Sequence, residues 1–156
     1  MQDLTRRSAL AMIVAGLGAC SSPEEPEQRP PARLYPGETQ ELRVLIEKYA
    51  DIYEVPVDLV HRVIQRESDY RPHARNGPYY GLMQILPQTA RTMGHRGPPE
   101  SLLDAETNLT YAVKYLRGAW LVSDGDMSTA VSWYARGYYY EAKRRGLLVE
   151  TGLRPA

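Results

Sequence analysis

Residues 57–68 read Val-Asp-Leu-Val-His-Arg-Val-Ile-Gln-Arg-Glu-Ser, and residues 81–84 read Gly-Leu-Met-Gln. In the first run, apolar residues recur at positions i, i+3 and i+4, and Glu67 continues the same face at i+7. This spacing predicts an amphipathic helix that carries a glutamate on its apolar face. The apolar positions are Val60, Val63 and Ile64.

Glu67 is the first candidate functional residue, because an isolated carboxylate is costly to bury. Desolvation raises the pKa of such a carboxyl, which suits a general acid working near neutral pH. The alternative is a structural glutamate at a helix end that reaches solvent or pairs with Arg66 or Arg71. Structural ion pairs outnumber catalytic carboxylates, so Glu67 alone leaves both interpretations open.

The neighbourhood of Glu67 contains an ordered series of motifs. Glu67-Ser68 is followed by a short loop, then by Gly-Leu-Met-Gln at 81–84, and then by Pro-x-Thr-Ala at 87–90. This series resembles the SLT-domain lytic transglycosylases, over roughly residues 40–145. The resemblance implies an all-α, mainly helical domain of lysozyme-like fold. An ordered, multi-part match is more specific than a single motif.

In that family one glutamate suffices for catalysis. The resemblance implies that Glu67 first protonates the β-1,4 bond between N-acetylmuramic acid (MurNAc) and N-acetylglucosamine (GlcNAc). As a carboxylate it then accepts the proton of the MurNAc 6-hydroxyl, which closes a 1,6-anhydro ring. No metal or cofactor is implied. The positions expected to contact substrate are Ser68, Tyr80, Gly81, Met83, Gln84, Leu86 and Tyr134.

The sequence departs from the family pattern at two places. The usual Tyr-Asn-x-Gly is replaced here by Tyr-Ala-Arg-Gly at residues 134–137, and the loop before Gly81 is shorter than the common form. Two rival functions therefore stay open. One is a hydrolytic lysozyme, which requires a second carboxylate across the cleft. The other is a non-catalytic lipoprotein that binds glycan strands or scaffolds an envelope complex.

The N-terminal residues are typical of an export signal rather than of a folded domain. Residues 1–19 contain the pair Arg6-Arg7, which resembles a twin-arginine signal, and then a short stretch of apolar and small residues. The stretch ends at Cys20 in a sequence that resembles a lipoprotein box, so we expect lipidation of Cys20. Residues 20–37 are rich in proline and charge, which predicts a disordered tether. By resemblance to lipoprotein sorting, Ser21 indicates the periplasmic side of the outer membrane.

Composition narrows the possible partners. The chain of 156 residues has 19 basic and 19 acidic residues and no basic block, which argues against nucleic acid. Cysteine and histidine do not recur at metal-ligand spacing. The expected partners are peptidoglycan strands, the membrane through Cys20, and possible envelope or secretion machinery.

Periodicity predicts the remaining elements of a domain at residues 38–148, with 149–156 as a tail. No segment shows the alternation of a strand. Helices are expected over residues 42–53, from Pro56 onward, over 87–93, after an N-cap at Asp104, and from Gly125 onward.

Overall fold

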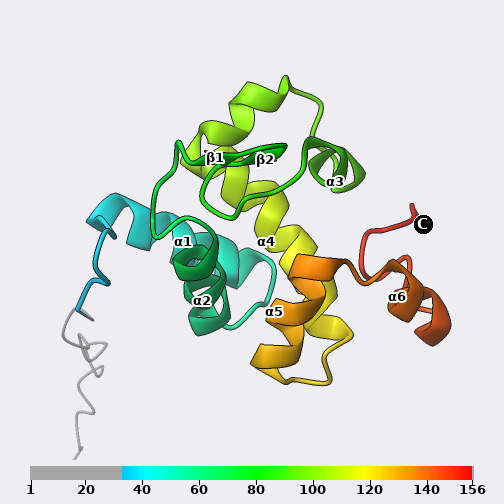
Figure 1. Cartoon of the computed structure of the whole chain (residues 1–156). Coiled ribbons are helices and arrows are strands. Elements are labelled where there is room, and N and C mark those ends of the chain that lie inside the picture. Colours follow the sequence, from blue (N-terminus) through cyan, green and yellow to red (C-terminus); the bar gives the residue numbers. More distant parts are fainter. Residues whose placement is uncertain (1–32, 156) are drawn as a thin grey trace, which may run out of the picture. The chain divides into compact units, whose positions relative to one another are not determined.

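The computed structural model describes residues 33–155 (Figure 1). Its elements in chain order are α1 (Gln40–Ile52), α2 (Val57–Glu67), β1 (Arg75–Asn76), β2 (Tyr79–Tyr80), α3 (Pro87–Thr92), the 3-10 helix η1 (Pro99–Leu103), α4 (Ala105–Leu121), α5 (Met127–Arg136) and α6 (Tyr139–Arg145). The expected mainly helical domain is therefore confirmed.

Helix α4 is the central element of the fold. It packs against α1, α3, η1 and α5, and α2 is held between α1 and α5 (Figure 1). The Asp104 side chain caps α4 as expected, because it accepts a hydrogen bond from the backbone amide of Thr107. The apolar stripes of the helices form one core, and its fully buried residues include Ile46, Val63, Ile64, Leu109 and Leu116.

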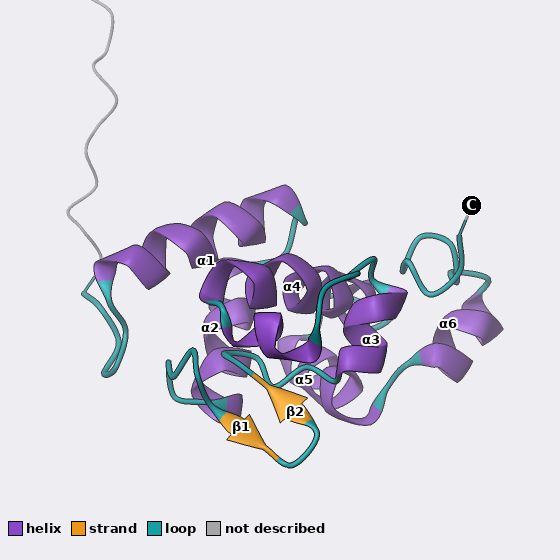
Figure 2. Cartoon of the chain, turned by 90° about the horizontal axis from the view of Figure 1, so that it is seen from above, coloured by secondary structure: helices purple, strands orange, loops and turns teal. Residues whose placement is uncertain are grey.

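A small β-hairpin lies between α2 and α3, where the sequence predicted only a turn (Figure 2). Strands β1 and β2 pair antiparallel, with Arg75 opposite Tyr80 and Asn76 opposite Tyr79. Each strand has two residues, which is too short for alternation to be visible in the sequence. The 3-10 helix η1 likewise lies outside the segments for which the sequence predicted helices.

Most expectations for the N-terminus, including residues 1–19 and Cys20, lie outside the described residues. Of the predicted tether at residues 20–37, residues 33–37 are described, and the Tyr35 ring centroid lies 4.8 Å from that of His61. Packing of the described residues onto the domain thus begins before residue 38. At the other end Thr151 is buried, and its hydroxyl donates to the Leu147 carbonyl. Among helices in residues 33–155, none has the length and apolar character needed to span a membrane.

Candidate active site

Glu67 is the last residue of α2, and its side chain is 24 % exposed. Burial raises the pKa of its carboxyl, and the charge of Arg66 offsets part of that rise. The Arg66 Nε atom lies 3.5 Å from Glu67 Oε1, but the Arg66 side chain is 53 % exposed, so solvent weakens this pair. Arg71 does not pair with Glu67, because its Nε donates to the Ser68 carbonyl. Glu67 is thus desolvated but still accessible.

Two adjoining cavities form a groove in front of Glu67. The first, of about 300 Å³, is lined by Arg66, Glu67, Asn76, Tyr79, Gln84, Tyr134 and Ala135. The second, of about 310 Å³, is lined by Tyr79, Gln84, Ile85, Leu86, Thr89, Tyr115, Tyr134, Ala135, Arg136 and Gly137. Four residues belong to both, namely Tyr79, Gln84, Tyr134 and Ala135. The groove therefore runs from the end of α2 past the hairpin to the end of α5.

Gln84 occupies the wall shared by the two cavities. Its backbone is left-handed, with φ +48°, and its side chain is nearly buried. The side-chain amide donates to the carbonyls of Ala74 at 3.1 Å and Gly81 at 2.9 Å. These two bonds fix the amide in place, so Gln84 contributes a rigid polar surface to the groove.

Tyr134 lies opposite on α5 and also reaches both cavities. Its hydroxyl donates to the Met83 carbonyl at 2.8 Å, and its ring packs edge-on against Tyr115 at 5.5 Å. Burial raises the pKa of Tyr134 well above its ordinary value, and the nearby charge of Glu67 adds to this rise. The phenol thus stays neutral beside the candidate acid.

Four of the residues expected to contact substrate are instead buried and absent from the groove lining. Met83 has no exposed surface, and Tyr80 is covered by the core and by the guanidinium of Arg75. The Ser68 hydroxyl accepts from the backbone amide of Arg71. Gly81 packs so tightly that an added Cβ would lie 2.3 Å from the Leu102 carbonyl oxygen. These residues build the walls, whereas Glu67, Gln84, Leu86 and Tyr134 line the groove.

Asn108 organises the wall behind Gly81. It has no exposed surface, and its amide donates to the carbonyls of Tyr80 and Leu102 at 2.8 Å each. Its oxygen accepts from the backbone amide of Met83 at 3.0 Å. One buried amide from α4 thus fixes the backbone on both sides of Gly81.

The groove also contains residues that sequence reasoning did not assign to the site. Asn76 and Thr89 line it, as does Arg136, whose guanidinium lies 3.9 Å from the centroid of the Trp133 ring. Tyr79 lines both cavities and is 42 % exposed. Only the departure at residues 134–137 gave any sequence signal for Arg136.

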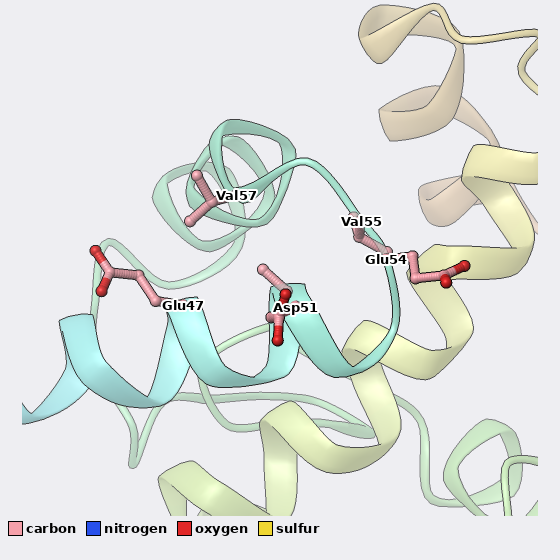
Figure 3. Close-up of a pocket in the computed structure, with 6 residues that line it drawn as sticks. Glu47, Asp51, Glu54, Val55 and Val57 are labelled. Carbon is pink, nitrogen blue, oxygen red and sulfur yellow. The ribbon is translucent and has the colours of Figure 1, made fainter. Parts of the chain in front are cut away.

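A third cavity, near the end of α1, offers no comparable site. Its lining includes Glu47, Asp51 and Glu54, whose carboxylates point in different directions (Figure 3). In residues 33–155, no group of three or more His, Cys, Asp or Glu side chains is placed to hold a metal ion.

The segment that contains the groove residues also matches a known protein family. The model of the family described as "Transglycosylase SLT domain" matches residues 44–146. The chain is 36% identical over 98 residues to "Peptidoglycan transglycosylase gp16" of Escherichia phage T7. That match covers 60% of this chain but 7% of the phage protein, so the two share one segment of a much longer chain. No solved structure matches the chain significantly.

Proposed function

Because the chain belongs to the Transglycosylase SLT domain family, we propose that it is a peptidoglycan lytic transglycosylase with Glu67 as its acid and base. The observation that carries the proposal is the state of Glu67. This carboxyl opens into a groove, its pKa is raised by burial, and it is the one acidic residue among the described residues that line the two cavities. A single carboxyl of this kind can donate and later accept one proton.

The reaction begins with Glu67 protonated. Its proton passes to the oxygen that links C1 of MurNAc to GlcNAc, and the C1–O bond breaks with the electron pair leaving on that oxygen. The resulting Glu67 carboxylate accepts the proton of the MurNAc 6-hydroxyl while O6 bonds to C1. The products are a 1,6-anhydro-MurNAc end and a GlcNAc 4-hydroxyl. Glu67 is again protonated, and no water is consumed.

The other groove residues support this chemistry by holding the strand. Gln84 offers a fixed polar wall beside Glu67, and Tyr79 offers an exposed aromatic face of the kind that packs on sugar rings. The Tyr134 hydroxyl proton is committed to Met83, so its oxygen lone pairs are available to positive charge developing at C1. Two adjoining cavities suit an extended polymer better than a small ligand.

Two observations favour this reaction over its rivals. Hydrolytic glycosidases usually place a second carboxyl about 5 to 9.5 Å from the first, and the described lining of the groove supplies none. If Glu67 were buried in a closed ion pair, a non-catalytic binding function would be the better interpretation. The Glu67 side chain is instead accessible, and its ion-pair partner Arg66 is exposed to solvent.

Substitution of Glu67 by glutamine tests the assignment. Glu67→Gln keeps the shape of the side chain but cannot cycle the proton, so we expect turnover of purified sacculi to fall by a factor of about 10² to 10⁴. Glu150→Gln, which changes an exposed glutamate outside the groove, is the matched control. Retained turnover in a folded Glu67→Gln protein would remove Glu67 from the mechanism.

We also propose that Cys20 carries the lipid anchor that holds the domain at the periplasmic face of the outer membrane. The support is the sequence Leu-Gly-Ala-Cys at residues 17–20, followed by Ser21. We expect Cys20→Ser to move the protein from the membrane to the soluble fraction. Unchanged membrane association of that variant would contradict the anchor.

A further inference from the structure

A buried polar network that the proposed reaction does not use connects the residues before α1 with α2 and with the turn that follows Glu67. Its centre is Glu38, whose side chain has no exposed surface. The two Glu38 oxygens accept hydrogen bonds from Nε and an Nη of Arg43, both at 2.6 Å. Glu38 Oε2 also accepts from the backbone amide of Tyr35 at 2.9 Å. The residues just before α1 are therefore tied to α1.

The same network reaches α2 and the turn that follows Glu67. Nδ1 of His61, on α2, lies 2.8 Å from the Tyr70 hydroxyl and 3.8 Å from Glu38 Oε1. The Tyr35 ring stacks on the Tyr70 ring, with centroids 6.0 Å apart and planes 14° from parallel. Tyr70 itself is 2 % exposed. Tyr70 thus has a hydrogen-bond partner on α2 and a stacking partner in the segment before α1.

Tyr70 belongs to an unfavourable backbone turn. Asp69 and Tyr70 have φ values of +51° and +61°, a left-handed conformation that non-glycine residues adopt at a cost in free energy. Such strain persists only where the surrounding structure holds it. Gly37 packs against this turn, because a Cβ added there would lie 3.1 Å from the Asp69 carbonyl oxygen. The turn begins two residues after Glu67, so its geometry fixes how α2 ends.

We propose that Tyr35, Glu38, Arg43, His61 and Tyr70 form an N-terminal clamp that positions the Glu67 carboxyl. None of the five lines the groove, so they are positioning residues that act through the turn at Ser68–Tyr70. The backbone amides of Ser68 and Asp69 both donate to the Ile64 carbonyl, which ends the helix immediately after Glu67. Release of Tyr70 would let this last turn rearrange and expose Glu67 to water.

The charges within the clamp are balanced. Burial alone would raise the pKa of Glu38, but the bonds from Arg43 and from the Tyr35 amide outweigh it and lower that pKa. Burial lowers the pKa of His61, which favours the neutral imidazole. Removing Glu38 or Arg43 would leave a buried charge without its partner and endanger folding. Tyr70→Phe removes one hydroxyl and keeps the ring, so it is the informative variant.

The inference rests on the proposed function, but its first test does not require turnover. In the full chain, NMR titration of the Glu67 carboxyl should give a lower pKa in Tyr70→Phe than in the unmodified protein, because water reaches the carboxyl. Tyr49→Phe is the control, because Tyr49 is also a buried tyrosine whose hydroxyl makes a hydrogen bond, here by donating to the Glu106 carboxylate on α4 at 3.1 Å. Similar small losses in Tm are expected for both variants. An unchanged Glu67 pKa in Tyr70→Phe would overturn the clamp.

Kinetics provide the second test. We expect kcat on sacculi to fall about tenfold in Tyr70→Phe, with KM and the Tyr49→Phe values nearly unchanged. The alkaline limb of the pH profile should also move to lower pH in Tyr70→Phe alone. Equal losses in the two variants would indicate a structural role and reject positioning. If the unmodified protein showed no turnover, that result would contradict the proposed function. The NMR titration of Glu67 would still test whether the clamp positions this carboxyl.

Discussion

At the residue scale, the position of Glu67 on α2 was predictable from the sequence, but its ion-pair partner was not. The spacing from Val60 to Glu67 predicted a glutamate on the apolar face of α2. In the structure Val60, Val63 and Ile64 are buried, whereas the Glu67 side chain is 24 % exposed. The sequence could not tell whether Arg66 or Arg71 would pair with it. The outcome depends on Arg71 turning to the Ser68 carbonyl, a contact set by the turn after the helix.

The pH dependence of the reaction should follow the protonation of Glu67. Because its pKa is raised, the acid form persists above the ordinary 4.5, and kcat/KM should fall as the pH rises through the raised pKa. The charge of Arg66 lowers that pKa, so Arg66→Gln should move this alkaline limb of the pH profile, the fall in kcat/KM, to higher pH. Arg62→Gln, on the same helix but outside the groove lining, should leave it in place. A limb that stays fixed in Arg66→Gln would contradict this account of the Glu67 environment.

Arg136 is expected to contribute to substrate choice. Among the described residues it has no carboxylate within 4.0 Å, and it lines the cavity farther from Glu67. Peptidoglycan carries carboxylates on its stem peptides, and a charge-assisted hydrogen bond contributes about 1.5 to 3 kcal/mol. Arg136→Gln should therefore lower kcat/KM on peptide-bearing strands by roughly tenfold or more.

Peptidoglycan strands with amidated carboxyls provide the test of that interpretation. On these strands Arg136→Gln and the unmodified protein should have the same kcat/KM. Lys143→Gln changes another exposed cation, outside the groove, and should have no effect on either substrate. Equal losses on both substrates would show that Arg136 acts through structure and not through charge.

At the scale of elements, most helices were predictable, but the hairpin, η1 and the break between α5 and α6 were not. Helices α1, α2 and α4 have stripes long enough to reveal their period, and Asp104 has the residue type of an N-cap. The hairpin depends on contacts far along the chain. Asn108, from α4, binds the backbone at Tyr80 and Met83, residues 28 and 25 positions away. No local pattern encodes those bonds.

Gly81 provides the test of this arrangement. Gly81→Ala should destabilise the protein by about 3 kcal/mol or more, because the new Cβ would collide with Asn108 and the Leu102 carbonyl. Gly146 has the same φ of +74° but nothing within 4 Å of an added Cβ. Gly146→Ala should therefore cost only about 1 kcal/mol of backbone strain. Chemical denaturation measures both, and equal costs would show that strain alone governs position 81.

At the scale of the whole molecule, the motifs identified the fold better than they identified the groove. Motif order implied a lysozyme-like helical domain, and the six α-helices and one small hairpin found in residues 33–155 agree with it. The motif residues Ser68, Gly81 and Met83 are buried and are not among the residues that line the groove. The lining comes from α2, the hairpin, residues 84–86, α3, α4 and the end of α5. The Tyr134 hydroxyl donates to the Met83 carbonyl, 51 residues away in the sequence. Such a surface depends on tertiary packing, which a single sequence does not display.

The most direct test of the central claim is mass spectrometry of the muropeptides released from purified sacculi by the full chain. The reaction proposed for Glu67 closes a ring without consuming water, so its products should end in 1,6-anhydro-MurNAc. Each would be lighter by one water than the corresponding hydrolytic product. Products with ordinary reducing ends would contradict the account, because they require water as the nucleophile.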